Sequence, residues 1–87
     1  MGEVAITYRL MPSGLEVDLK GVQDKAMEVL GERRFHSSEV KPIAFGLNAL
    51  EVTAIVEEVE GLGERLESEL AAIEGVQSIE TVALTRL

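Results

Sequence analysis

Two stretches in which apolar residues occupy every second position constrain the fold of this chain most. They span residues 3–10 and residues 50–57. Successive side chains of a strand point to opposite faces of a sheet, so each stretch predicts a strand with one buried face. The second stretch predicts a long, central strand.

Two other stretches repeat their apolar residues at helical spacing. Residues 19–30 follow Asp18, a good N-cap, and precede Gly31, a typical helix stop. Residues 62–73 show the same spacing and end before Gly75. Each stretch predicts an amphipathic helix that packs one face against the sheet.

The remaining segments predict two further strands. Residues 33–40 are polar and predict an edge strand. Residues 76–87 predict a last strand, in which the change of phase between Ile79 and Val82 suggests a bulge or a change of the buried face. The element order is then β-α-β-β-α-β. We expect an α+β fold, the ferredoxin-like βαββαβ two-layer sandwich with antiparallel sheet order 4-1-3-2, formed by residues 1–87 as a single domain.

Charge and composition narrow the function. Sixteen acidic and eight basic residues give a formal net charge of −8, which disfavours direct nucleic-acid binding and suits either solubility or a basic partner. No apolar run approaches the roughly 20 residues of a membrane span, and no signal peptide or cysteine is present. We therefore expect a cytoplasmic protein without membrane contact.

Few residues are suited to catalysis. The chain has no cysteine, which excludes a cysteine nucleophile and thiolate metal sites, and His36 is its only histidine, which excludes a histidine-rich metal site. Glu57, Glu58 and Glu60 form an acidic cluster that we interpret as solvated residues at a strand end. We expect no cofactor, no metal site and no enzyme activity. A small-molecule-binding regulatory module is the alternative, and an acylphosphatase-like enzyme comes third.

Residues 41–47, Lys-Pro-Ile-Ala-Phe-Gly-Leu, connect two predicted strands and are an unusual connection. Pro42 fixes its φ angle, Gly46 tolerates angles that side chains forbid, and Phe45 is one of three aromatic residues in the chain. The residues alone leave two interpretations open: Ile43 and Phe45 either pack into the core or dock a partner.

This segment resembles the signature of the archaeal elongation factor 1-beta family. The resemblance extends over essentially the whole chain, through the opening Met-Gly-Glu-Val, residues 42–47, the turn at residues 73–76 and the ending with a basic residue and leucine. It implies a guanine-nucleotide exchange domain that promotes replacement of GDP by GTP on elongation factor 1-alpha, the GTPase that delivers aminoacyl-tRNA.

The resemblance also implies site residues. Relatives place a penultimate lysine near the Mg²⁺ and phosphate site of the GTPase, a position held here by Arg86, and an aromatic that packs on the GTPase at the position of Val40. Arginine offers a planar fork that can bind phosphate or carboxylate through two hydrogen bonds. The residues expected to bind the partner are Val40, Lys41, Pro42, Ile43, Phe45, Gly46 and Leu87. We expect the segment around Phe45 and the tail at Arg86 to act together on one nucleotide pocket.

Overall fold

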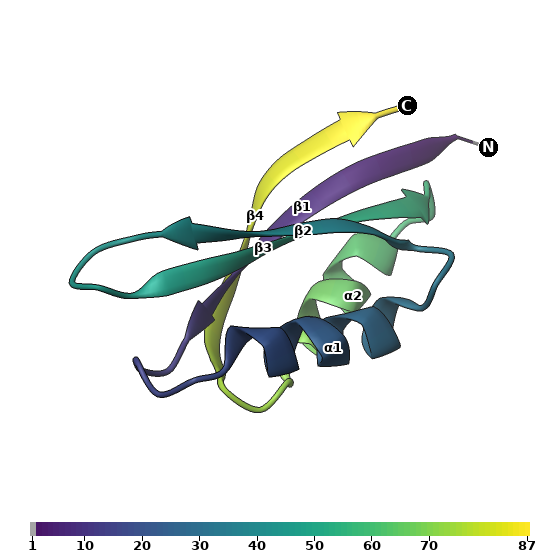
Figure 1. The fold of residues 1–87 in the computed structure, drawn as a ribbon. Coiled ribbons are helices and arrows are strands. Elements are labelled where there is room, and N and C mark those ends of the chain that lie inside the picture. The colour runs from purple at the N-terminus through teal and green to yellow at the C-terminus, as the bar shows by residue number, and fades with distance from the viewer. Residues whose placement is uncertain (1) are drawn as a thin grey trace.

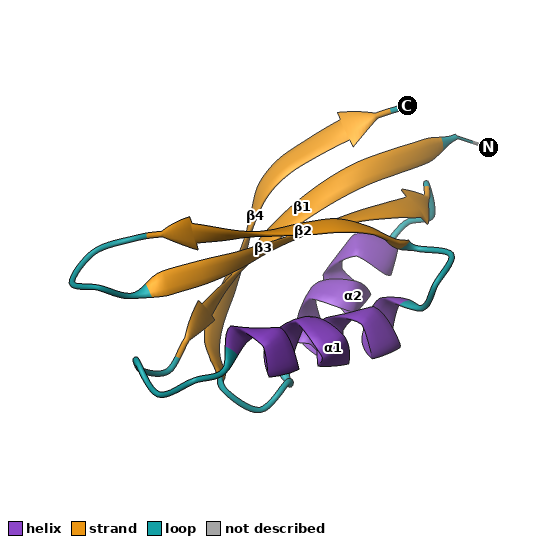
Figure 2. Ribbon diagram, in the orientation of Figure 1, coloured by secondary structure: helices purple, strands orange, loops and turns teal. Residues whose placement is uncertain are grey.

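The computed structural model describes residues 2–87, which form a four-stranded sheet covered on one face by two helices (Figure 1). The elements are β1 (Glu3–Pro12), α1 (Leu19–Leu30), β2 (Phe35–Pro42), β3 (Asn48–Glu57), α2 (Leu62–Ala71) and β4 (Val76–Arg86). All paired strands are antiparallel in the order β2-β3-β1-β4, which is the order 4-1-3-2 in reverse. The ferredoxin-like prediction is confirmed. Figure 2 shows the separate sheet and helix layers.

Helix α1 begins and ends where its capping residues predict. The Asp18 carboxylate accepts a hydrogen bond from the backbone N–H of Lys20 at 3.1 Å, which satisfies a donor of the first turn. At the other end Gly31 has a φ of 82° and donates its N–H to the carbonyl of Met27 at 2.8 Å. Glycine tolerates this left-handed φ without strain.

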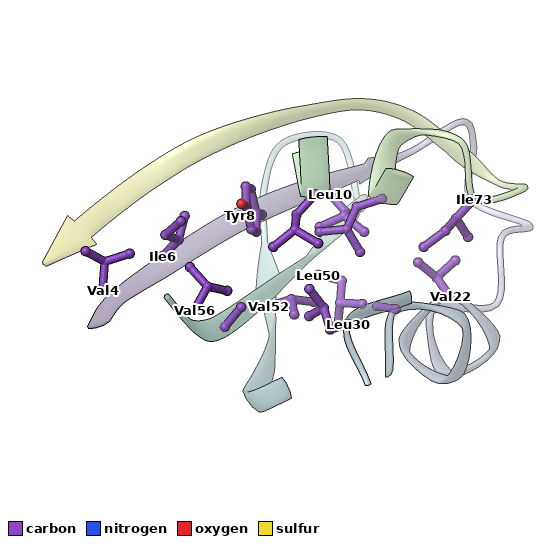
Figure 3. Packing of buried hydrophobic residues seen from close by; sticks show 14 residues of the cluster. Val4, Ile6, Tyr8, Leu10, Val22, Leu30, Leu50, Val52, Val56 and Ile73 are labelled. Atoms are coloured by element: carbon purple, nitrogen blue, oxygen red, sulfur yellow. The ribbon is translucent and has the colours of Figure 1, made fainter. Parts of the chain in front are cut away.

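The core lies between the sheet and the helices, where the alternating residues of β1 and β3 pack against the inner faces of α1 and α2 (Figure 3). Tyr8 is the only tyrosine and is buried, with its hydroxyl donating to the carbonyl of Gly63 at 2.9 Å. Burial, assisted by the nearby carboxylates of Glu67 and Glu64, raises the pKa of Tyr8 to about 12. This hydrogen bond joins the centre of the sheet to the start of α2.

Strand β2 differs from its predicted bounds. It begins at Phe35 instead of residue 33, because the N–H groups of Arg34 and Phe35 donate to the carbonyl of Gly31 and close a turn after α1. It also continues to Pro42, which lies opposite Asn48 in the register. β2 is an edge strand with one unpaired side, where the missing N–H of proline is tolerated.

Strand β4 contains the predicted bulge. Thr81 and Ala83 lie opposite consecutive residues of β1, so Val82 has no partner in the register. Beyond the bulge Arg86 lies opposite Val4, which is buried under the helices. Residues directly opposite each other in a sheet share a face, so Arg86 leaves β4 on the helix side. No helix within residues 2–87 is long and apolar enough to span a membrane.

Candidate partner-binding site

The connection between β2 and β3 is a tight hairpin tip. The N–H of Leu47 donates to the carbonyl of Ala44 at 3.1 Å, and the N–H of Ile43 donates to the carbonyl of Leu47 at 2.8 Å. The two central residues of the turn, Phe45 and Gly46, have φ angles of 59° and 79°. Positive φ at both central positions is typical of type I′ hairpin turns, where Asn-Gly is the usual pair.

Phe45 is the unusual residue of this turn. A bulky side chain at positive φ is rare and costs free energy, and Phe45 is the only residue other than glycine with such an angle among residues 2–87. Packing in the core does not compensate for this cost, since the residue is 94% exposed. Ile43, by contrast, is half-buried. The core interpretation is therefore wrong for Phe45, which projects into solvent on a backbone held by hydrogen bonds.

The predicted contact residues of β2 lie beside the tip. Val40 is exposed and lies opposite Leu50 of β3, which places it on the helix side of the sheet. Lys41 pairs with Glu39 at 3.5 Å, so its charge is partly balanced within the strand. Pro42 is exposed where the strand ends. This end of the molecule thus presents apolar side chains with little unbalanced charge.

Arg86 lies at the end of β4, where its backbone is fixed and its side chain is in solvent. The N–H of Leu87 donates to the carbonyl of Glu3 at 2.9 Å, which keeps the tail on the sheet. The guanidinium Nε lies 2.9 Å from a carboxylate oxygen of Glu58, and the Arg86 side chain is 78% exposed. Leu87 is also exposed.

Glu58 was not predicted as a partner of Arg86. The N–H of Glu58 donates to the carbonyl of Gly2, which fixes the loop after β3 beside the start of β1. Arg86 reaches this carboxylate from β4, on the other side of β1. In the sequence, only the cluster of acidic residues at this strand end indicated a possible partner for a basic side chain. The contact between Arg86 and Glu58 forms because the strand order brings the two strand ends together.

The acidic cluster is paired in part, so its interpretation as simply solvated needs correction. Glu57 accepts a hydrogen bond from Arg34 at 3.2 Å, and this bond holds the pKa of Glu57 below its usual value. Glu58 pairs with Arg86, while Glu60 is exposed. Within residues 2–87 no group of three or more acidic or histidine side chains is arranged to hold a metal ion.

The open face of the sheet is also charge-balanced. Arg9 contacts Glu51 and Glu80 on the neighbouring strands, each at 3.0 Å, and the hydrogen bond to Glu51 raises the pKa of Arg9. Next to them the hydroxyls of Thr7 and Thr53 are 3.0 Å apart. Within residues 2–87 the arginine of this face is thus paired, and Tyr8 and Phe35 lie opposite Val52 and Ala54 on the helix side, away from a base that would stack here.

The β2–β3 hairpin tip and the C-terminus lie at opposite ends of the sheet (Figure 1). Arg86 is opposite Val4, while the β2–β3 hairpin lies beyond the pair Leu10–Leu50 at the other end of β1. The six steps along the strand from Val4 to Leu10 alone span about 20 Å at about 3.3 Å per residue. The expectation that both segments act on one pocket is wrong, because a partner must offer two separate patches to contact both.

Comparison with known proteins agrees with this arrangement of elements and motifs. Residues 5–87 match the family described as the EF-1 guanine nucleotide exchange domain. The chain belongs to this family. It is 40% identical to elongation factor 1-beta of Methanococcoides burtonii over 87 residues, covering 99% of this chain and 98% of the relative.

Two further relatives carry the same name. Elongation factor 1-beta of Archaeoglobus fulgidus is 41% identical over 81 residues, with 92% of each chain covered. That of Methanothermobacter thermautotrophicus is 40% identical over 88 residues, covering 100% of this chain and 99% of the relative. The resemblance inferred from the sequence is confirmed, and it supports a guanine-nucleotide exchange role in translation elongation.

Proposed function

We propose that this chain promotes the replacement of GDP by GTP on elongation factor 1-alpha. The observation that carries the proposal is the match of residues 5–87 to the exchange-domain family. Nucleotide exchange requires no covalent step by the chain itself. A factor that binds the nucleotide-free GTPase more tightly than the loaded one lowers the barrier to GDP release.

The hairpin tip is the proposed docking element. Phe45 offers almost its entire side chain for burial, and an aromatic side chain on a rigid turn loses little conformational freedom when it binds. The other contacts of this end are Val40, Lys41, Pro42, Ile43 and Gly46. Little unbalanced charge surrounds the tip, which suits an apolar pocket on the partner.

Arg86 is the proposed acting group at the opposite end, with Leu87 beside it. Its guanidinium is charged and exposed, and a partner phosphate or carboxylate can replace or share the Glu58 carboxylate that now binds it. An exposed ion pair contributes only about 0 to 1 kcal/mol, so little free energy is needed to break it. We propose that Arg86 disturbs the Mg²⁺ and phosphate site of the GTPase while the hairpin holds a second patch.

The broader setting is part of the same proposal. Residues 1–87 act as one exchange domain in the cytoplasm, with a protein partner and no direct contact to nucleic acid or membrane. The net charge of −8 and the balanced charges of the open sheet face support the absence of nucleic-acid contact.

Release of a fluorescent GDP analogue from elongation factor 1-alpha of the same organism tests the proposal. The chain should accelerate release in proportion to its concentration until the GTPase is saturated. Unlabelled GDP serves as the chase, and heat-denatured chain serves as the control. Release at the intrinsic rate with the folded chain would refute the proposed function.

A further inference from the structure

We propose that Leu15, in the loop between β1 and α1, forms the second half of the docking surface at the hairpin end and contacts an apolar patch of the GTPase beside Phe45. This inference rests on the proposed function and assigns a residue outside the family signature to the interface. The first observation is the exposure of two apolar side chains. Phe45 and Leu15 are the two most exposed large apolar side chains among residues 2–87, at 94% and 72%.

The two loops that carry these residues meet in space. The Leu15 Cδ2 lies 3.9 Å from the point where a Cβ on Gly46 would stand, which is ordinary van der Waals distance. A small cavity between the loops is lined on one side by Pro12, Gly14 and Leu15 and on the other by Gly46 and Leu47. In Figure 1 both loops lie at the left end, away from the two termini.

The loop that carries Leu15 is anchored on both sides. Before it, the N–H of Ser13 donates to the carbonyl of Gly75 at 2.9 Å. After it, Val17 packs against the core, with its Cγ1 3.0 Å from the point where a Cβ on Gly75 would stand. Leu15 is therefore held outward on a fixed loop, and burying it on a partner costs little ordering of the backbone.

A single exposed leucine is ordinary, but two exposed apolar side chains on neighbouring loops are not. Such a pair, with the exposed carboxylate of Glu16 beside Leu15 in the chain, fits an apolar centre with a polar rim. The occupant that fits is the apolar patch on the GTPase that receives Phe45, because the Leu15 surface is continuous with the Phe45 tip through Gly46.

Titration of Leu15→Ser against nucleotide-free elongation factor 1-alpha tests the inference. We expect affinity to fall about 5- to 30-fold, from the loss of most of one leucine's burial. Leu15→Met should restore most of it. The factor concentration that gives half-maximal GDP release should rise with this loss of affinity. Met27→Ser, which removes an exposed apolar side chain from α1, is the matched control and should bind like wild type.

The outcomes separate the two proposals. Wild-type chain that neither binds the GTPase nor accelerates release refutes the proposed function and this inference with it. Wild-type activity together with unchanged affinity of Leu15→Ser refutes the inference alone. A wild-type dimer in light scattering that Leu15→Ser converts to a monomer would assign the patch to a second copy of the chain and also overturn it. Circular dichroism confirms that each variant is folded.

Discussion

Replacing Phe45 with glycine should stabilise the fold while weakening its contact with the GTPase. The left-handed φ of 59° costs an ordinary residue about 1 to 2 kcal/mol, a cost that glycine does not incur. Glycine loses more backbone conformational entropy on folding than phenylalanine does, and this loss offsets about 0.5 to 1 kcal/mol of the gain in stability. The Phe45 side chain contributes nothing to the core, so the net gain should be about 0.5 to 1 kcal/mol, or a melting temperature higher by about 3 to 6 °C.

The same substitution removes the proposed anchor. Complete burial of a phenylalanine side chain contributes about 1.5 to 3 kcal/mol. Phe45 is almost fully exposed in the free chain, so nearly all of this free energy is available for binding. Affinity for the nucleotide-free GTPase should therefore fall about 10- to 150-fold, at 1.4 kcal/mol for each factor of ten.

Phe45→Ala separates the two effects. It removes the same side chain but keeps the unfavourable φ, so it should bind as weakly as Phe45→Gly without the gain in stability. Urea unfolding and isothermal titration calorimetry measure the two quantities on the same three proteins. A Phe45→Gly variant that is less stable than Phe45→Ala would refute the argument from backbone strain, and wild-type affinity in both would remove Phe45 from the interface.

Three other predictions concern the opposite end and the core. Arg86→Ala should slow GDP release at saturating factor about 10- to 100-fold through loss of a charge-assisted hydrogen bond. The release rate with Arg86→Lys should lie between those of wild type and Arg86→Ala, and the free energy of unfolding should not change. Equal release rates for wild type and Arg86→Ala in stopped-flow experiments would contradict the role of Arg86. Tyr8→Phe should lower the free energy of unfolding by about 1 kcal/mol, since the carbonyl of Gly63 loses its donor. Because the folded-state pKa of about 12 exceeds the ordinary value of 10.0, the stability that Tyr8 contributes should persist below pH 10 and decline towards pH 12. Tyrosinate absorbance of the wild type measures this titration, and a midpoint near pH 10 in the folded chain would refute the burial effect. Gly63→Ala should raise the free energy of unfolding by about 0.5 to 1 kcal/mol in urea, because the added Cβ meets only the flexible end of Ile6 at 3.4 Å. A variant less stable than wild type would show that the Ile6 side chain cannot adjust to the added methyl group.

Much of the fold was predictable because its signals are local. Alternation in β1 and β3 and the caps at Asp18 and Gly31 depend on neighbouring residues only. The turn that delays β2 to Phe35 was missed, because it uses hydrogen bonds to the carbonyl of Gly31 that leave no mark in the sequence pattern.

The site was less predictable. The pairing of Arg86 with Glu58 depends on two strand ends meeting across β1, which no local pattern reports. The separation of Arg86 from Phe45 was implicit in the predicted strand order, since β4 ends beside the start of β1 and the hairpin lies at the other end of that strand. No sequence pattern marks Leu15 as a binding residue, because only its exposure and its position next to the turn at Gly46 distinguish it from other leucines.

The unpaired residue Val82 decides which side of the sheet bears the terminal cation. Ile79 and Thr81 lie opposite Leu10 and Tyr8, on the helix side, so a regular ladder that paired Val82 as well would turn Arg86 to the open face. Because Val82 takes no partner, Arg86 lies opposite Val4 instead, and its guanidinium reaches Glu58. One extra residue in this strand therefore sets the direction of the last charged side chain, independently of which residue stands at that position.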